Sequence, residues 1–141
     1  MPDALSIVGF PKYKIYAKSN PGNTPSGPTD CDFFVRILDV YPDGKEFFVV
    51  ESAVNARARE FARSIAEGHQ NDDAPFTNID IGKIYEYYFQ GYPIAYTFAQ
   101  GHKIKVLISS SNYPRFQANA NVPIVPNEFF RRKPADGRTY L

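Results

Sequence analysis

The feature that most constrains this chain is a strand-like run at residues 103–109 that stops abruptly in polar residues. Three of its apolar residues fall on alternate positions and therefore share one face: Ile104, Val106 and Ile108. Such alternation is typical of a β-strand with one buried face. The run therefore predicts a central strand of a sheet.

An ordered turn is expected directly after this run. Ser109-Ser110-Ser111 continues an apolar strand poorly, and Pro114 has no backbone N–H to donate to a neighbouring strand. The side chains of Asn112 and Arg115 can satisfy the backbone groups that such an exit leaves unpaired.

The composition favours an all-β fold. Ten tyrosines, twelve phenylalanines, twelve prolines and nine glycines stand against a single methionine, which suits pleated surfaces and tight turns. Residues 19–29 predict a surface loop, and Pro42-Asp43-Gly44 predicts a tight hairpin turn. Further strands are predicted at residues 12–18, 32–41, 46–53, 84–90 and 95–98.

One domain over residues 1–141 accounts for this pattern, because the chain shows no internal repeat and no second core. We predict a two-sheet sandwich of the jelly-roll type. The one helix-like stretch lies within residues 53–68. There a strand to about Ala58 should give way to roughly one or two helical turns, which Gly68 closes.

Several classes of protein are excluded by charge and hydropathy. A net charge of +1 with scattered basic residues offers no surface for phosphate backbones, so nucleic acid is not an expected partner. No apolar run approaches the ~20 residues that cross a bilayer, so a membrane is not expected either. Met1-Pro2-Asp3-Ala4 does not have the pattern of a signal peptide.

The sequence lacks the parts of a hydrolase active site. No Gly-x-Ser-x-Gly nucleophile motif occurs, and we interpret His69 as solvated and His102 as a hydrogen-bonded structural residue. Asp30-Cys31-Asp32 and Asn71-Asp72-Asp73 offer oxygen ligands without the spacing of a calcium loop. We therefore predict no catalytic, cofactor-binding or metal-binding residue in this chain.

A second class of function depends on a dense group of aromatic residues. Rings exposed on a β-sandwich can stack on sugars, so a free-standing carbohydrate-binding module is the alternative function. Rings that alternate along strands also form core and cross-strand pairs. The aromatic residues of this dense group are Tyr85, Tyr87, Tyr88, Phe89, Tyr92 and Tyr96.

Three charged residues interrupt strand-like sequence. Asp39 lies among apolar residues, and Arg57 and Arg59 close another such segment. Burial of any of them is costly without a partner, so a structural ion pair of Asp39 with Arg57 or Arg59 is one prediction. A solvent-facing Asp39 beside the hairpin is equally supported.

The order and spacing of several segments carry a family resemblance. They are Ile7-Val8-Gly9-Phe10, Asp32-Phe33, residues 39–44, Arg57-Ala58-Arg59, Tyr85-Glu86, Phe98 and residues 101–116. Together they resemble the C-terminal β-domain of the serine hydrolases that include X-Pro dipeptidyl-peptidases, cocaine esterase, α-amino-acid ester hydrolases and glutaryl-cephalosporin acylases.

The resemblance implies a galactose-binding-like jelly roll from a longer enzyme, whose Ser-His-Asp triad lies in a preceding α/β-hydrolase domain. That catalytic domain is the implied partner, and homo-oligomers would form through the parent enzyme. Asn112, Tyr113, Arg115 and Phe116 are the candidate interface, where this domain would help to shape the active-site region. The competing interpretation is that the rings of Tyr113 and Phe116 cap this domain's own core.

Two further segments look nearest the α-amino-acid ester hydrolase and acylase branch: Val125-Pro126-Asn127-Glu128-Phe129-Phe130 and Arg138-Thr139-Tyr140-Leu141. The strand that usually precedes Ile7 in that family is missing, and the chain stops where a final strand would be completing. We therefore expect these residues to be a piece of a longer enzyme.

Overall fold

The computed structural model describes residues 1–20, 28–69, 73–119 and 121. The segments at 125–130 and 138–141, and most of the predicted loop at 19–29, lie outside these residues. The elements are β1 (Leu5–Gly9), β2 (Lys12–Ala17), β3 (Pro28–Thr29), β4 (Asp32–Val40), β5 (Glu46–Asn55), the 3-10 turn η1 (Ala56–Ala58), α1 (Arg59–Glu67), β6 (Ile79–Asp80), β7 (Tyr85–Gln90), β8 (Ile94–Phe98) and β9 (Lys103–Ser109).

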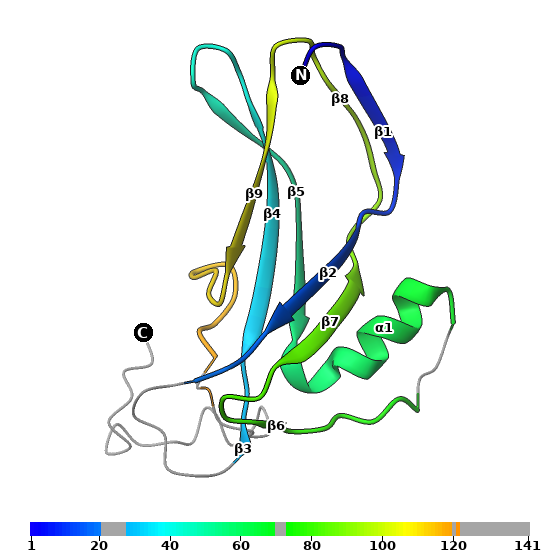
Figure 1. Cartoon of the computed structure of the whole chain (residues 1–141), viewed down its shortest axis with the longest axis vertical. Coiled ribbons are helices and arrows are strands. Elements are labelled where there is room, and N and C mark those ends of the chain that lie inside the picture. The colour runs from blue at the N-terminus through cyan, green and yellow to red at the C-terminus, as the bar shows by residue number, and fades with distance from the viewer. Residues whose placement is uncertain (21–27, 70–72, 120, 122–141) are drawn as a thin grey trace.

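Two layers of antiparallel strands form the molecule. One layer is the three-stranded sheet β5-β4-β9, with β4 in the middle, and the other contains the ribbons β1-β8 and β2-β7. The short pair β3-β6 closes one end, and α1 packs against β7 (Figure 1). The predicted class, an all-β sandwich of the jelly-roll type with one short helix, is confirmed. Within the described ranges, no helix is long and apolar enough to cross a membrane.

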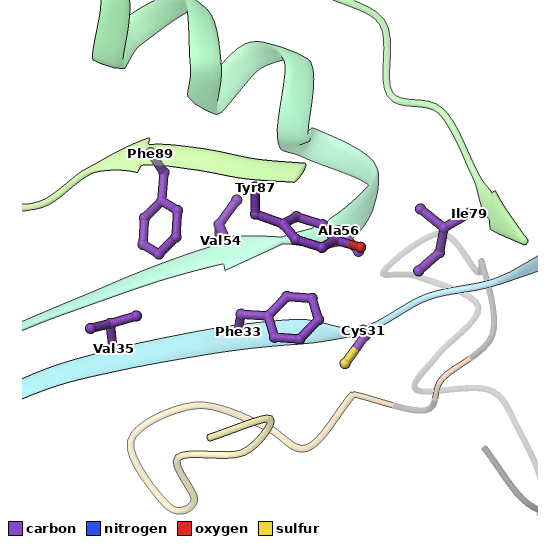
Figure 2. Packing of buried hydrophobic residues seen from close by; sticks show 8 residues of the cluster. All are labelled: Cys31, Phe33, Val35, Val54, Ala56, Ile79, Tyr87 and Phe89. Atoms are coloured by element: carbon purple, nitrogen blue, oxygen red, sulfur yellow. The ribbon is translucent and has the colours of Figure 1, made fainter. Parts of the chain in front are cut away.

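The core lies between β4 and β5 on one side and β7 on the other, as Figure 2 shows. Phe33 and Val35 alternate along β4 toward this core, and the ring of Phe33 lies 4.6 Å from that of Tyr87 on β7. Side chains of a strand point to alternate faces, so the residues between these two face outward. The buried cluster consists of Cys31, Phe33, Val35, Val54, Ala56, Ile79, Tyr87 and Phe89.

The end of β5 corrects one prediction. The strand ends at Asn55 rather than near Ala58, because the Asn55 side chain accepts a hydrogen bond from the backbone N–H of Arg57 at 3.0 Å and starts a turn. Helix α1 then runs for nine residues. It ends at Gly68, as predicted, because this residue adopts a left-handed φ of +87° and caps the helix.

Strand β9 corrects a second prediction. Ile104, Val106 and Ile108 share one face, as the register with β4 requires. Yet β9 pairs only with β4 among the described strands and is therefore an edge strand, not a central one. Alternation identifies residues that share a face, but it does not determine how many neighbours the strand has.

The predicted ion pair of Asp39 with Arg57 or Arg59 is wrong. Asp39 is only 1% exposed, so it does not face solvent either. It lies near the hairpin end of β4, whereas Asp32, at the other end of that strand, is opposite Asn55. Strand length therefore separates Asp39 from both arginines. Arg59 instead donates to the backbone oxygen of Thr77 at 2.8 Å.

His102 and Tyr96 are the partners of Asp39. Nδ1 of His102 lies 2.9 Å from Oδ1 of Asp39, and the Tyr96 hydroxyl donates to Oδ2 at 2.9 Å. The interpretation of His102 as a hydrogen-bonded residue therefore agrees with the structure. Burial and the hydrogen bond to Asp39 raise the pKa of Tyr96 to about 12, so its hydroxyl remains a donor at neutral pH. These contacts tie β4 to β8 and to the start of β9.

Removing the Asp39 carboxylate should destabilise the domain strongly. Asp39→Ala leaves His102 and Tyr96 without their buried acceptor, and we expect a loss of about 3 kcal/mol in the free energy of unfolding, measured by denaturant titration. The control is Glu46→Ala, which removes an exposed ion pair with Lys105 nearby and should cost less than about 1 kcal/mol. Equal effects of the two substitutions would contradict the assignment of Asp39 as the buried acceptor for His102 and Tyr96.

Candidate functional site

The predicted turn after β9 is present and ordered by its own hydrogen bonds. The backbone N–H of Phe116 donates to the carbonyl oxygen of Asn112 at 2.9 Å. Just before it, the Ser109 hydroxyl donates to the carbonyl oxygen of Ser111 at 2.8 Å. The Tyr113–Pro114 peptide bond is cis. We call residues 112–116 the β9 turn.

A buried carboxylate on β5, in the same sheet as β9, holds the β9 turn in place. Glu51 of β5 has a side chain only 5% exposed, and Nη2 of Arg36 lies 2.6 Å from its Oε2. Nη1 of Arg115 lies 3.2 Å from Oε1 of the same carboxylate, and Arg36 also donates to Oδ1 of Asn112 at 3.0 Å. Two turn residues are therefore attached to one Arg36–Glu51 pair.

The charge of this group is not balanced. Two guanidinium groups, those of Arg36 and Arg115, contact the single carboxylate of Glu51, so one positive charge is left over. Arg36 is partly exposed and Arg115 is mostly exposed, whereas Glu51 is buried. The surface beside the β9 turn is therefore weakly cationic and could accept a carboxylate from a partner.

The two rings of the β9 turn differ in their surroundings. The ring of Phe116 packs on that of Phe34 from β4, with 5.1 Å between centroids, and thus partly caps the outer face of this domain. Tyr113 is 62% exposed. The interpretation that these rings cap this domain's own core, rather than dock on a partner, therefore applies in part to Phe116 and does not apply to Tyr113.

An open groove of about 420 Å³ lies beside the turn. Exposed rings of Phe10, Tyr92 and Phe116 line it together with Arg115, and Ser52 of β5 also lines it. Gly91 is closely surrounded there, because a Cβ atom at this position would lie 2.2 Å from Oγ of Ser52 and 3.1 Å from side-chain carbons of Pro11 and Tyr13. A second hollow of about 170 Å³ lies where Arg36, Glu51 and Asn112 meet Leu107 and Ser109. The β9 turn thus adjoins two concave surfaces.

The structure brings together no group of three or more His, Cys, Asp or Glu residues suited to a metal ion within its described ranges. Asp30 and Asp32 instead accept hydrogen bonds from the amide of Asn55, and burial raises the pKa of Asp32. Asn71 and Asp72 of the other acidic segment, 71–73, lie outside the described residues.

No nucleophile is assembled in the described part of the chain. Burial raises the pKa of the Cys31 thiol to about 11, so it is protonated at neutral pH and a poor nucleophile. The hydrogen bonds found for the His102 ring go to Asp39, and none of them joins it to a serine or cysteine.

The aromatic group does not form one face for a ligand. Tyr87 and Phe89 lie in the core, Tyr96 is bound to Asp39, and Tyr85 is bound to Asp80. Only Tyr92, which is exposed, reaches the groove.

Arg36 and Glu51, which carry the site, were not among the predicted site residues. Their signal was present, because each is a charged residue inside a strand-like segment. Their pairing follows from the register of β4 and β5, in which Arg36 lies directly opposite Glu51.

Comparison with known proteins identifies a family for this chain. The family model described as the X-Pro dipeptidyl-peptidase C-terminal non-catalytic domain matches residues 1–135. Cocaine esterase from Rhodococcus sp. (strain MB1 Bresler) is 28% identical over 119 residues, which cover 84% of this chain and 18% of that enzyme.

Two solved structures share the fold. An aminopeptidase from the marine sediment archaeon Thaumarchaeota archaeon matches with a TM-score of 0.72 and 25% identity, over 98% of this chain and 21% of that one. An α-amino acid ester hydrolase labelled with selenomethionine matches with a TM-score of 0.64 and 24% identity, again over 98% of this chain and 21% of that one.

The chain spans about a fifth of the length of these relatives. The family match, in contrast, extends over nearly all of it. The chain therefore belongs to the family of X-Pro dipeptidyl-peptidase C-terminal non-catalytic domains.

Proposed function

We propose that this domain belongs to a serine hydrolase acting on acyl esters, amides or X-Pro peptides, and that the β9 turn packs against the catalytic domain of that enzyme. The observation that carries the proposal is the attachment of the β9 turn to the Arg36–Glu51 pair, through Asn112 on Arg36 and through Arg115 on Glu51. A buried carboxylate is costly unless it is paired, so the Arg36–Glu51 pair is strongly held and gives the turn a fixed point of attachment.

The exposed groups of the turn are those typical of docking surfaces. Aromatic residues and arginine are enriched at protein interfaces, and a preordered surface loses less conformational entropy on binding. Tyr113 and Arg115 are exposed, and Phe116 is partly so. The surplus positive charge beside them suits an acidic group of the catalytic domain. In this position the domain would help to shape the active-site region.

A free-standing carbohydrate-binding module remains the second candidate. The groove favours it, because exposed Phe10 and Tyr92 offer ring faces beside polar side chains. The buried positions of Tyr87 and Phe89 weaken it. Binding of the 141-residue chain to immobilised polysaccharides would support this function, and loss of that binding in Tyr92→Ala would place it in the groove.

The 141-residue chain alone should show no hydrolase activity, because its sequence has no Gly-x-Ser-x-Gly motif and its buried Cys31 has a raised pKa. The measurement is turnover of acyl esters and X-Pro dipeptide amides by the purified chain. Turnover that disappears in His102→Ala or in Cys31→Ala would contradict the prediction.

In the longer enzyme, Arg115→Ala and Tyr113→Ala should each lower kcat/KM about tenfold or more, because each removes a docking group. Stability of the 141-residue chain should change by less than about 1 kcal/mol, since both side chains are mostly exposed there. Phe116→Ala should also weaken the isolated chain, because it removes the contact with Phe34.

The matched control is Lys45→Ala, which removes an exposed cation from the turn between β4 and β5. This variant should leave kcat/KM unchanged. If all three β9-turn variants keep both activity and stability, neither docking nor capping is the role of this turn.

A further inference from the structure

Arg36 keeps unused hydrogen-bond donors on the outer face of the sheet. Its Nε and Nη2 donate to Oε2 of Glu51 at 3.0 and 2.6 Å, and Nη2 also donates to Oδ1 of Asn112 at 3.0 Å. Within the described ranges none of these bonds uses Nη1, which carries two N–H groups and is not buried. Two donors of a charged group are therefore open to a ligand.

The guanidinium group of Arg36 is held in a fixed orientation. Glu51 binds it at two nitrogen atoms, and Asn112 accepts from one of them. The ring centroid of Phe48 lies 5.9 Å from Cζ of Arg36, so this ring faces the guanidinium plane. A donor that is already held in place loses little conformational entropy when it binds an acceptor.

The charge around Nη1 favours an ion with one negative charge. Arg36 occupies Oε2 of Glu51, and Arg115 lies 3.2 Å from Oε1 of the same carboxylate. Both oxygens of Glu51 are thus engaged, and two cations face one anion. Among the described residues that line the adjoining hollow, Glu51 is the single acid. One positive charge is left over, which matches a carboxylate better than a doubly charged phosphate.

The hollow beside Arg36 has room for such a group. Its volume is about 170 Å³, enough for several water molecules and hence for a carboxylate with the methylene groups next to it. Leu107 and Phe34 supply apolar walls for those methylene groups. Asn112 lines the same hollow, and its Nδ2 is buried without a hydrogen-bond partner in the described part of the chain. A donor in this state gains from an oxygen acceptor that comes within its reach.

We propose that this hollow is a binding site for one carboxylate group, which accepts a charge-assisted hydrogen bond from Nη1 of Arg36 beside the amide of Asn112. The inference deepens the proposed function, on which it rests for the source of the carboxylate. That source is either an acidic side chain of the longer enzyme or a free carboxylic acid, and the chemistry of recognition is the same for both.

Titration of the 141-residue chain with sodium acetate tests the site. Acetamide is the matched neutral probe, and sodium chloride keeps the ionic strength constant. Acetate should give saturable NMR shifts at the methyl groups of Leu107 and at Nε–H of Arg36, and acetamide should give none. Absence of a saturable shift with acetate, an equal shift with acetamide, or tighter binding of phosphate than of acetate would each overturn the proposal.

Arg115→Ala tests the role of the surplus charge. This variant leaves Arg36 on Glu51 but cancels the extra positive charge, so acetate binding should weaken about tenfold. The matched control is Lys45→Ala, which lowers the net charge of the chain by the same amount in the turn between β4 and β5. It should bind acetate as the unmodified chain does. Equal weakening in both variants, or in neither, would contradict the inference.

The same Leu107 signals identify the source of the carboxylate in the longer enzyme. An acetate response that persists there assigns the site to a free carboxylate, and a response that is lost assigns it to a side chain of that enzyme. The two proposals also fail separately. A chain that binds acetate within a longer protein that lacks hydrolase activity would refute the proposed function alone. A hydrolase whose 141-residue domain does not bind acetate would refute the carboxylate site alone.

Discussion

The position of β4, with a strand on each side and side chains used on both faces, is the constraint on which the rest of the structure depends. Its inner face supplies Phe33 and Val35 to the core and Asp39 to the polar contacts at the hairpin end. Its outer face supplies Phe34 and Arg36 to the β9 turn. Because side chains alternate along a strand, one register fixes the core and the candidate site together.

Two buried carboxylates, one on each face of this sheet, set the arrangement of the distant segments. Asp39 holds Tyr96 and His102 on the inner face, and Glu51 holds Arg36 and Arg115 on the outer face. A buried acid is costly only when all of its partners are lost, and Arg36 still pairs with Glu51 when Arg115 is removed. The two acids therefore fix the positions of these segments specifically, whereas an apolar core alone tolerates small shifts of its side chains.

The sequence was sufficient for features that depend on local pattern. Alternation with a period of two residues predicted most of the longer strands. Gly68 was predicted as the end of the helix because glycine readily adopts the left-handed conformation that ends helices. Features that depend on the register between strands could not be predicted from the sequence. Asp39 required a partner, but the choice of His102 over Arg57 follows from how β8 and β9 meet the hairpin end of β4. The edge position of β9 was hidden for the same reason.

Strand β9 lies between two surfaces of different character. Leu107 and Ser109 face outward into the hollow beside Asn112, while Val106 and Ile108 face inward and are uncovered. The hollow and the apolar face lie on opposite sides of this strand, because its side chains alternate. Any displacement of β9 therefore moves the hollow, the apolar face and the start of the β9 turn together.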